Sequence, residues 1–381
     1  MTDYLSEARR IAPELAALRE SFHREPELGN REFLTADKIE NTLRGLGIET
    51  RRLLDTAVVG RLTGGRPGPC AALRADMDAL PLTETTGAAF ASVHPGVMHA
   101  CGHDVHLAAA LGAAKLLAAR RESLPGSVVF LFQPDEEGRG GAERMIREGV
   151  LDGVDAVFGA HVSPELPAGS VGVRYGKFYA ASDVFGITLY GRSAHGAERE
   201  KGIDALAAAA ALVTELLSLP ERLTDRSVLT IGTLRAGTAD NILPGEAELH
   251  GILRTLGPEA REAMRSMLRG AVDDIAARFS VRAELALRES YPGVVNDDGM
   301  TALAENAARS LLGTDRVRVL DAPTMTTEDF GYFLMERPGC FYHIGAGCPL
   351  PLHSPSFLPA ADAVVTAAAV HAAVIETFLI K

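Results

Sequence analysis

The chain has 381 residues, 47% of them hydrophobic and 23% charged, which gives it enough apolar material for real cores and enough length for two domains. Its formal charge of −12, with no local run of Lys and Arg, excludes nucleic acid as an expected partner. The opening residues lack an apolar signal core, and no run of about 18 apolar residues follows, so we expect a cytoplasmic protein that does not bind a membrane.

Helical patterns come first along the chain. The apolar spacing predicts one helix over 5–23 and a second over 35–47, with Thr35 as its N-cap and Gly47 as its stop. Continuous apolar runs at 70–81, 126–137 and 155–164 then alternate with helical patterns at 106–122 and 141–149. Buried strands separated by helices are typical of an α/β sheet covered by helices.

From about residue 180 the strands alternate apolar and polar residues, as half-buried strands do. Strands at 182–191, 226–237, 245–256 and 281–290, with helices at 202–219 and 257–279, give the order βαββαβ of a ferredoxin-like domain. Buried strands and helices return after residue 291, and the chain ends in a helix over 360–378. We therefore predict a large α/β domain formed by 1–179 and 291–381, with a ferredoxin-like domain inserted at 180–290.

Reactive side chains follow three of the predicted buried strands. The first strand ends at Asp76 and Asp78, the second at Asp135, Glu136 and Glu137, and the third at His161. In open α/β sheets ligands bind at the carboxyl ends of the strands, so these side chains are expected to converge.

Three further candidates lie outside the strands. Cys101 and His103 stand just before a predicted helix, and His353 lies in an irregular segment near the C-terminus. Imidazole, carboxylate and thiolate suit zinc or manganese, and a shared thiolate can bridge two ions. A plausible two-metal set consists of Cys101, His103, Glu137, His161 and His353.

Several of these residues also have a purely structural interpretation. His106 lies inside a helical pattern and is expected to be half-buried packing, as are His23, His250, His343 and His371. The acids after the second strand could open the next helix as a solvated loop. If they serve chemistry instead, adjacent side chains point to opposite faces, so one of Glu136 and Glu137 binds metal while the other reaches a water molecule.

The four cysteines, Cys70, Cys101, Cys340 and Cys348, are too few for a disulfide framework and form no CxxC pair. Two other functions remain open at this point. One is a thiol amidase with Cys101 as nucleophile and His103 as base, although thiol hydrolases usually draw the base from elsewhere in the fold. The other is a metal-binding protein without catalysis, in which Glu136 has no evident role.

The residues resemble a known family, the metal-dependent amidohydrolases that include aminoacylases and carboxypeptidase G, and within it the hippurate hydrolase and indoleacetic acid–amino acid hydrolase branch. The similarity runs nearly end to end, through the motifs FHREPELGNREFLTA, LRADMDALP, MHACGHDVHLA, FLFQPDEEGRGGAERMIREG, GAHVSP, GRSAHGA, NILPGEAELHGILR, TEDFGYF and LHSP. The resemblance implies a catalytic domain with two divalent metal ions and a smaller lid domain that mediates a homodimer or higher homo-oligomer.

The resemblance also implies roles for individual residues. Cys101 would bridge the two metals, and Glu136 would be the general base and acid. Asp78 would support the metal site from behind, and His103 would replace the histidine that relatives carry at Asp76. The remaining metal ligands would be His103, Glu137, His161 and His353.

In the lid, the resemblance implies that His195 reaches a neighbouring subunit's site and holds the substrate's carbonyl oxygen. Asn241 and Arg254 would contact the scissile amide and the substrate carboxylate. Two departures stand out: the loop after His195 lacks the proline that relatives usually have, and Asp135 replaces Ala or Thr, which adds a charge close to the base.

The function expected from these features is hydrolysis of N-acyl amino acids, hippurate-like or N-acetyl, to a carboxylic acid and a free amino acid. The cofactors would be two zinc or manganese ions, with nickel and cobalt as further candidates. Dipeptidase or carboxypeptidase activity at the same two-metal site is the alternative.

Overall fold

The structure is a computed structural model that describes residues 2–381. Its backbone divides into two compact units. Unit 1 contains the chain up to Gly176 together with Asn296–Ala322 and Asp329–Lys381, and unit 2 contains Lys177–Val295 and Pro323–Glu328. The assignment of these parts to catalysis and to a lid stays a prediction.

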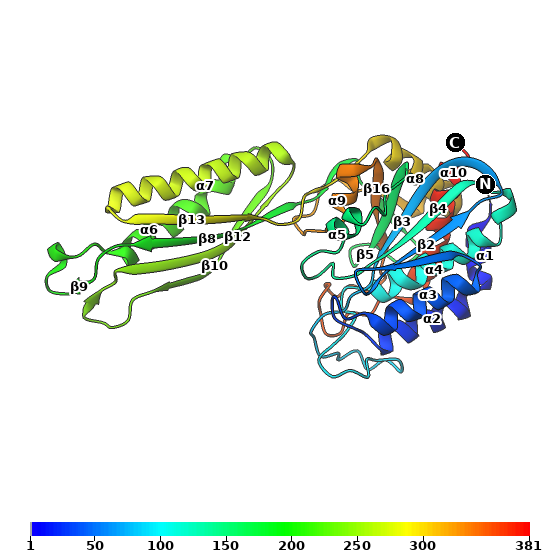
Figure 1. Cartoon of the computed structure of the whole chain (residues 1–381), viewed down its shortest axis with the longest axis horizontal. Coiled ribbons are helices and arrows are strands. Elements are labelled where there is room, and N and C mark those ends of the chain that lie inside the picture. The colour runs from blue at the N-terminus through cyan, green and yellow to red at the C-terminus, as the bar shows by residue number, and fades with distance from the viewer. Residues whose placement is uncertain (1) are drawn as a thin grey trace. The chain divides into compact units, whose positions relative to one another are not determined.

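Many elements of both units are labelled in Figure 1. Unit 1 has the helices α1 (Tyr4–Arg10), α2 (Ala12–Arg24), α3 (Phe33–Gly45), α4 (His103–Ala118), α5 (Ala142–Arg147), α8 (Asp298–Leu312), α9 (Gly331–Glu336) and α10 (Ala361–Leu379). Its sheet has the strands β1 (Glu49–Leu53), β2 (Ala57–Thr63), β3 (Arg66–Asp76), β4 (Pro125–Gln133), β5 (Ala156–Ser163), β6 (Val171–Val173), β15 (Val317–Val319) and β16 (Gly339–Gly345). Strands β7 (Gly176–Tyr179) and β14 (Val294–Asn296) form a separate two-stranded sheet.

The eight-stranded sheet of unit 1 has the order β1-β2-β4-β3-β5-β16-β6-β15. Its central strands β4, β3, β5 and β16 are parallel, whereas β1 and β2 join antiparallel at one edge. This is the mainly parallel, helix-covered sheet that the sequence predicts. Because β3, β4 and β5 are parallel neighbours, their carboxyl ends meet at one edge.

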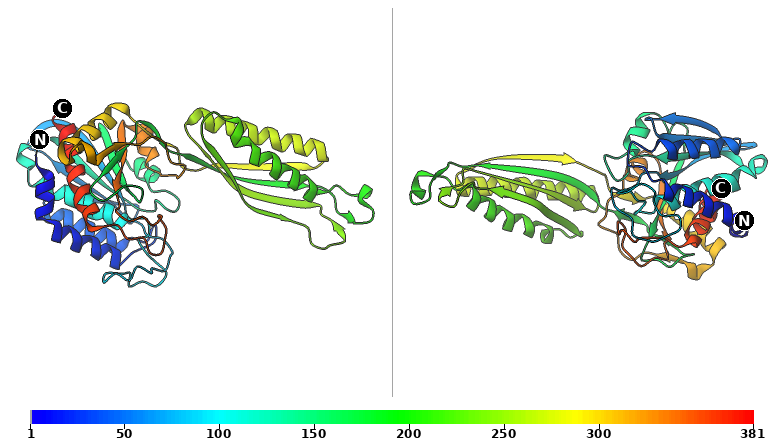
Figure 2. Two further views of the ribbon diagram at one scale, coloured as in Figure 1. Left: turned by 180° about the vertical axis from the view of Figure 1, so that it is seen from behind. Right: turned by 90° about the horizontal axis from the view of Figure 1, so that it is seen from below.

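One face of this sheet carries the main hydrophobic core. Alternate residues of β4 and β5, such as Phe130, Phe132 and Phe158, pack there with the apolar sides of α4 and α10. Helix α10 (red) lies beside α1 and α4, as the two views of Figure 2 show. Among residues 2–381, α10 is the one helix long and apolar enough to cross a membrane, yet 78% of its most apolar stretch is buried in the fold.

Unit 2 has β8 (Ala181–Tyr190), β9 (Ala194–His195), α6 (Ala205–Ser218), β10 (Ser227–Ala236), β11 (Ile242–Leu243), β12 (Glu246–Thr255), α7 (Pro258–Phe279) and β13 (Arg282–Glu289). Its four-stranded antiparallel sheet has the order β10-β12-β8-β13. Helices α6 and α7 cover one face through a second core that includes Leu212, Leu249 and Leu268. Four short 3-10 helices complete the chain: η1 (Arg121–Ser123), η2 (Arg199–Lys201), η3 (Leu219–Arg222) and η4 (Thr314–Arg316).

Two local predictions for the N-terminal helices are wrong. The single helix expected over 5–23 is two helices, because Pro13 lies in the first turn of α2 and cannot continue the ladder of α1. Helix α3 begins at Phe33 rather than after Thr35, because the carboxylate of Glu27 accepts hydrogen bonds from the N–H groups of Leu34 and Thr35 and caps the helix from a distance. Gly47 adopts a positive φ just beyond the helix, as a stop residue does.

Candidate metal centre

The predicted ligands of unit 1 come from four places on the same edge of the sheet. Cys101 and His103 stand at the start of α4. This helix follows the long irregular segment that comes after β3. Glu137 lies in the turn after β4, His161 lies near the end of β5, and His353 lies in the loop before α10. The convergence of strand ends that the sequence predicts is therefore present.

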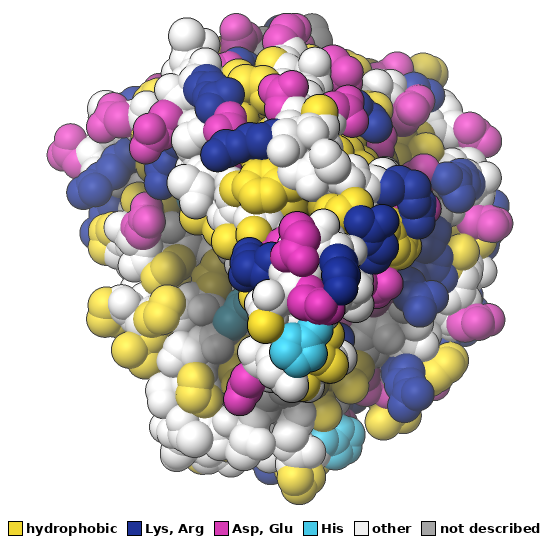
Figure 3. All heavy atoms as spheres, turned by 90° about the vertical axis from the view of Figure 1, so that its left-hand side faces the viewer, with side chains coloured by type: hydrophobic (Ala, Val, Ile, Leu, Met, Phe, Trp, Pro, Cys, Tyr) yellow, Lys and Arg dark blue, Asp and Glu magenta, His cyan; other side chains and the backbone are white. Residues whose placement is uncertain are grey.

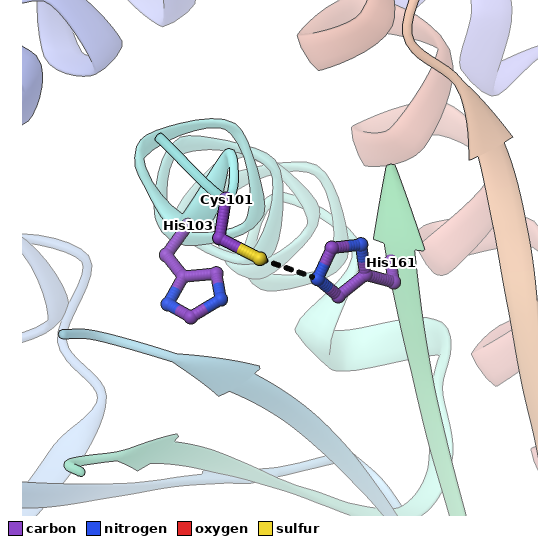
Figure 4. Close-up of side chains that lie close together, drawn as sticks. All are labelled: Cys101, His103 and His161. Atoms are coloured by element: carbon purple, nitrogen blue, oxygen red, sulfur yellow. Dashed lines mark hydrogen bonds between the residues drawn. The ribbon is translucent and has the colours of Figure 1, made fainter. Parts of the chain in front are cut away.

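Cys101, His103 and His161 point toward one another from α4 and β5 (Figure 4). The Sγ atom of Cys101 lies 3.3 Å from Nε2 of His161, and the two histidine rings are 5.8 Å apart between centroids. All three side chains are buried, and one ligand atom of each lies within 4.8 Å of the others. This spacing suits a small cation held between them.

Two of the groups of ligand atoms that overlap this trio also contain Glu137. Cys101, Glu137 and His353 form one, and His103, Glu136 and Glu137 form the other, each again within 4.8 Å. His353 Nε2 lies 3.0 Å from Oε1 of Glu137, and its own backbone N–H donates to the carbonyl of Ala100. The two groups share Glu137, so the donors surround one continuous space rather than two separate ones.

The two buried histidines are oriented by their second ring nitrogen. Nδ1 of His103 lies 2.8 Å from the backbone oxygen of Asp78, and Nδ1 of His161 lies 2.8 Å from that of Val162. A carbonyl only accepts, so both Nδ1 atoms carry a proton, and Nε2 is the ring atom left to bind a cation. Within residues 2–381, Nε2 of His103 has no hydrogen-bond partner, which fits a metal ligand held by an outer hydrogen bond.

The electrostatics of this cluster favour a cation. Burial raises the pKa of the Cys101 thiol well above its usual range, and the carboxylates of Glu137 and Glu136 raise it further. Burial alone would lower the pKa of His103, but the charges of Asp76 and Asp78 outweigh it and raise that pKa to about 10. Without a cation Cys101 is therefore a thiol, which argues against its use as a free nucleophile.

Comparison with known proteins identifies the family of this chain. Residues 72–377 match the profile of peptidase family M20/M25/M40. The chain belongs to that family. It is a hydrolase of the M20 type, and the resemblance inferred from its motifs is confirmed.

Among M20 relatives, N-acetyl-L-cysteine deacetylase of Bacillus subtilis is 37% identical over 362 residues, covering 94% of this chain and 86% of the relative. Thermostable carboxypeptidase 2 of Saccharolobus solfataricus is 36% identical over 380 residues and 96% of either chain. The crystal structure of the YXEP protein of Bacillus subtilis, a dinuclear metal-binding peptidase of the M20 family, superposes with a TM-score of 0.88 at 35% identity, over 97% of this chain and 99% of that one.

Asp78 lies beside the cluster of candidate ligands. Its Oδ2 accepts a hydrogen bond from the backbone N–H of Glu137 at 2.9 Å, and its Oδ1 lies 3.3 Å from Nδ1 of His103. It therefore contacts one residue from each side of the cluster. Oδ2 of Asp76 lies 3.7 Å from Nε2 of His103, so the two side chains are neighbours, and the replacement of a relative's histidine by His103 stays a prediction.

His106 is the residue that the sequence interpretation underrated. It is buried rather than half-buried, and its Nδ1 lies 2.6 Å from Asp76 Oδ1. Its Nε2 accepts the backbone N–H of Val162 at 2.9 Å, so Nδ1 must carry the proton. His106 therefore joins the end of β3 to the residue after His161. The signal was its position three residues after His103, on the same face of the helix.

The prediction of half-buried packing is also wrong for three other histidines. His23 is fully buried between Asp104 and Glu84, and His371 is buried with Nδ1 at 2.6 Å from the hydroxyl of Tyr342. His250 is exposed on β12, where it pairs with Glu248. Burial of His23 and His371 comes with specific polar partners, which sequence spacing does not reveal.

The lid residues predicted for the M20 mechanism lie in two places within unit 2. His195 is exposed on β9, opposite Ile242 of β11, and the N–H of Gly196 donates to the carbonyl of Asn241. Arg254 lies near the far end of β12, where it donates to the carbonyl of Met325. Arg254 lies eight residue steps along β12 from Glu246, which is roughly 27 Å at the rise of an extended chain.

Asp135 has a left-handed backbone with φ of 61°. Its carboxylate accepts a hydrogen bond from Asn30 at 2.5 Å and lies 3.7 Å from the guanidinium of Arg144. The contacts of this unusual residue thus join two loops of unit 1.

Proposed function

We propose that the chain hydrolyses N-acyl amino acids, hippurate-like or N-acetyl, to a carboxylic acid and a free amino acid. The observation that carries the proposal is the cluster of thiol, imidazole and carboxylate donors, buried or half-buried except for His353, with Glu136 beside it. The deacetylase relative, which covers nearly the whole chain, supports this substrate class over other amides.

The donors fit two divalent ions of the zinc or manganese kind, because thiolate, imidazole and carboxylate are their usual ligands. Cys101 would bridge, and the other ligands would be His103, Glu137, His161 and His353. When bound, such ions activate water and polarise a carbonyl oxygen. The orphaned Nε2 of His103 and the carbonyl-bound Nδ1 atoms of both buried histidines are what such ligands require.

The protein's own side chains would transfer one proton and contact the substrate at its carbonyl oxygen and at its carboxylate. Glu136 would take the proton from the attacking water and deliver it to the leaving nitrogen. His195 would donate to the carbonyl oxygen as negative charge develops there, with Asn241 beside it. Arg254 would pair with the substrate carboxylate through its planar fork.

His195 and Asn241 are proposed to serve the site of a partner subunit. They lie side by side at one end of unit 2, separated from Arg254 by most of β12. That separation exceeds the length of a small N-acyl amino acid, so one copy of unit 2 cannot bring all three to one substrate. A homodimer through unit 2 would supply the missing pair. Cytoplasmic location stays a prediction.

The test is a substrate screen by mass spectrometry with metal-reconstituted protein, comparing N-acetyl, N-benzoyl and long-chain acyl amino acids with dipeptides. Turnover of the acyl amino acids supports the proposal. Turnover of dipeptides alone favours the carboxypeptidase alternative, since one relative is a carboxypeptidase. Phenanthroline should abolish activity. A chelator-resistant activity lost in Cys101→Ser would favour the thiol amidase, and metal binding without any turnover would favour a binding protein.

A further inference from the structure

The turn that carries Glu136 has no helix or strand of its own. It follows β4 and runs from Asp135 to Gly140, and the N–H groups of Gly140 and Arg139 donate to the carbonyl and the carboxylate of Asp135. The left-handed backbone of Asp135 costs about 1 kcal/mol or more and must be held by its surroundings. The direction of the Glu136 side chain therefore depends on what holds the residues on either side.

Two buried carboxylates hold those residues. The N–H of Asp135 donates to Oε1 of Glu32 at 3.0 Å, and the N–H of Glu137 donates to Oδ2 of Asp78 at 2.9 Å. Glu32 is 0% exposed and Asp78 is 2% exposed. Glu136 is thus bracketed by one anchored peptide before it and another after it.

Glu32 is itself fixed at both oxygens. It is the N-cap residue of α3, so its backbone position is set by the helix. Its Oε2 accepts a hydrogen bond from the hydroxyl of Thr56 at 2.9 Å, and Thr56 is fully buried at the turn between β1 and β2. The carboxyl group therefore links a helix, a hairpin and the Glu136 turn.

We propose that Glu32 is a positioning residue for catalysis, which fixes the Glu136 turn through the N–H of Asp135. This rests on the proposed role of Glu136 as base. Glu32 does not touch the ligand cluster directly, so it acts on the direction of Glu136 rather than on the metals.

The partners of Glu32 allow its hydrogen bonds to be tested separately from its negative charge. Its partners are a hydroxyl and a backbone N–H, and burial together with the nearby Asp78 raises the pKa of Glu32 to about 7. The carboxylate of Asp135, the other acid close by, is directed to Asn30 and Arg144. A protonated Glu32 keeps both bonds, with Oε1 accepting from Asp135 and the acid proton donated to Thr56.

Glutamine can make the same two bonds, whereas alanine can make neither. In E32A we expect kcat to fall at least roughly tenfold, since misplacement of a catalytic group by about 1 Å can cost about 100-fold, with KM and metal content unchanged. In E32Q we expect kcat within about threefold of wild type, which is under ~0.7 kcal/mol of barrier. Rescue by the isosteric amide would assign the effect to position.

A matched control separates the Glu136 turn from helix α3. Glu27 caps the same helix through the N–H groups of Leu34 and Thr35 without contacting the turn. E27A should lower the melting temperature and leave kcat unchanged. If E27A loses as much kcat as E32A, a general loosening of α3 explains the result and the proposal fails.

Hydrogen exchange gives a readout that does not need activity. The amides of 133–140 should exchange faster in E32A and at the wild-type rate in E32Q, with metal loaded. Unchanged exchange in E32A, or kcat retained within about twofold, would overturn the proposal. Equal loss of kcat in E32Q and E32A would overturn it as well.

The same series distinguishes failure of the proposed function. If Glu136→Gln keeps activity while 133–140 loosens in E32A, the assignment of the base is wrong and the anchoring role of Glu32 stands. If Glu136→Gln is inactive and E32A is fully active, the base stands and the positioning role is wrong.

Discussion

The metal cluster of unit 1 and the His195 end of unit 2 are built in opposite ways. Cys101, His103, Glu136 and His161 are no more than 6% exposed, and the two histidines each hold a backbone carbonyl. His195 is exposed, and its Nδ1 accepts a hydrogen bond from the N–H of Ala197, two residues along the chain. In the space-filling view, histidine side chains (cyan) can be seen at the surface near acidic and basic side chains (Figure 3).

The difference is between side chains that are held in place before a ligand binds and a side chain that gains its partners only when a complex forms. A buried donor that is bonded on its far side is held in place before any ligand arrives, and its replacement disturbs the fold around it. An exposed donor on a two-residue strand contributes little to stability and acquires its partners only in a complex. Substitutions in the two regions should therefore differ in what they damage, apart from their effect on rate.

The largest effect is expected for Glu136→Ala. Loss of the base should lower kcat by roughly 100- to 10,000-fold, since a positioned acid or base contributes about that much. Two metal ions should remain bound, as measured by mass spectrometry of the native protein. Activity within about tenfold of wild type, equivalent to about 1.4 kcal/mol, would show that another group is the base.

His195→Ala should lower kcat by roughly 100- to 1,000-fold, as removal of one oxyanion donor does, without a change in melting temperature. His250→Ala, which removes another exposed histidine of unit 2, should change neither. A fall in stability comparable to that of a buried variant would break the distinction between the two regions.

Mixing inactive subunits tests whether His195 acts across the dimer. Glu136→Ala and His195→Ala chains, denatured and refolded together, should regain up to about a quarter of wild-type activity, because a mixed dimer has one complete site. If no activity returns although mixed dimers form, His195 serves its own subunit.

His106→Leu should weaken metal binding by about 10- to 100-fold, the usual cost of losing an outer-shell partner. The variant leaves Asp76 Oδ1 and the N–H of Val162 without His106, beside the proposed ligand His161. Competition with a chelator measures the change. His371→Leu is the buried control, since its partner is Tyr342 and the metal affinity should stay at the wild-type value.

The sequence predicts the cluster because each strand's apolar run shows by itself which reactive residues follow the strand end. Asp76, Glu137 and His161 each follow an apolar run, and the parallel order β4-β3-β5 brings those ends together. The division into buried and half-buried strands could also be predicted, because continuous apolar runs indicate the first kind and alternating apolar and polar residues the second.

The supporting contacts could not be read from the sequence, because they join distant residues. Glu32 and Asp135 are 103 residues apart, and His106 contacts Asp76 across 30. The cap of α3 was missed although it is nearer in sequence, because Glu27 lies outside the helical pattern whose first N–H groups it caps. Such contacts depend on tertiary packing, which spacing along one chain does not encode.

The smallest effect concerns the pH dependence of stability through His23. Its two ring nitrogens lie 3.0 Å from Asp104 and 3.1 Å from Glu84, so both must donate and the ring is an imidazolium. Burial alone would lower the pKa of His23, but the two carboxylates outweigh burial and raise it. Because the folded protein holds this proton more tightly than the unfolded chain, the stabilisation is complete below the usual pKa of 6.5 and is lost as the pH rises through the folded value. Calorimetry from pH 6 to pH 9 should show a fall of a few degrees in melting temperature that is absent in His23→Gln, whereas an identical slope in that variant would assign the dependence to other groups.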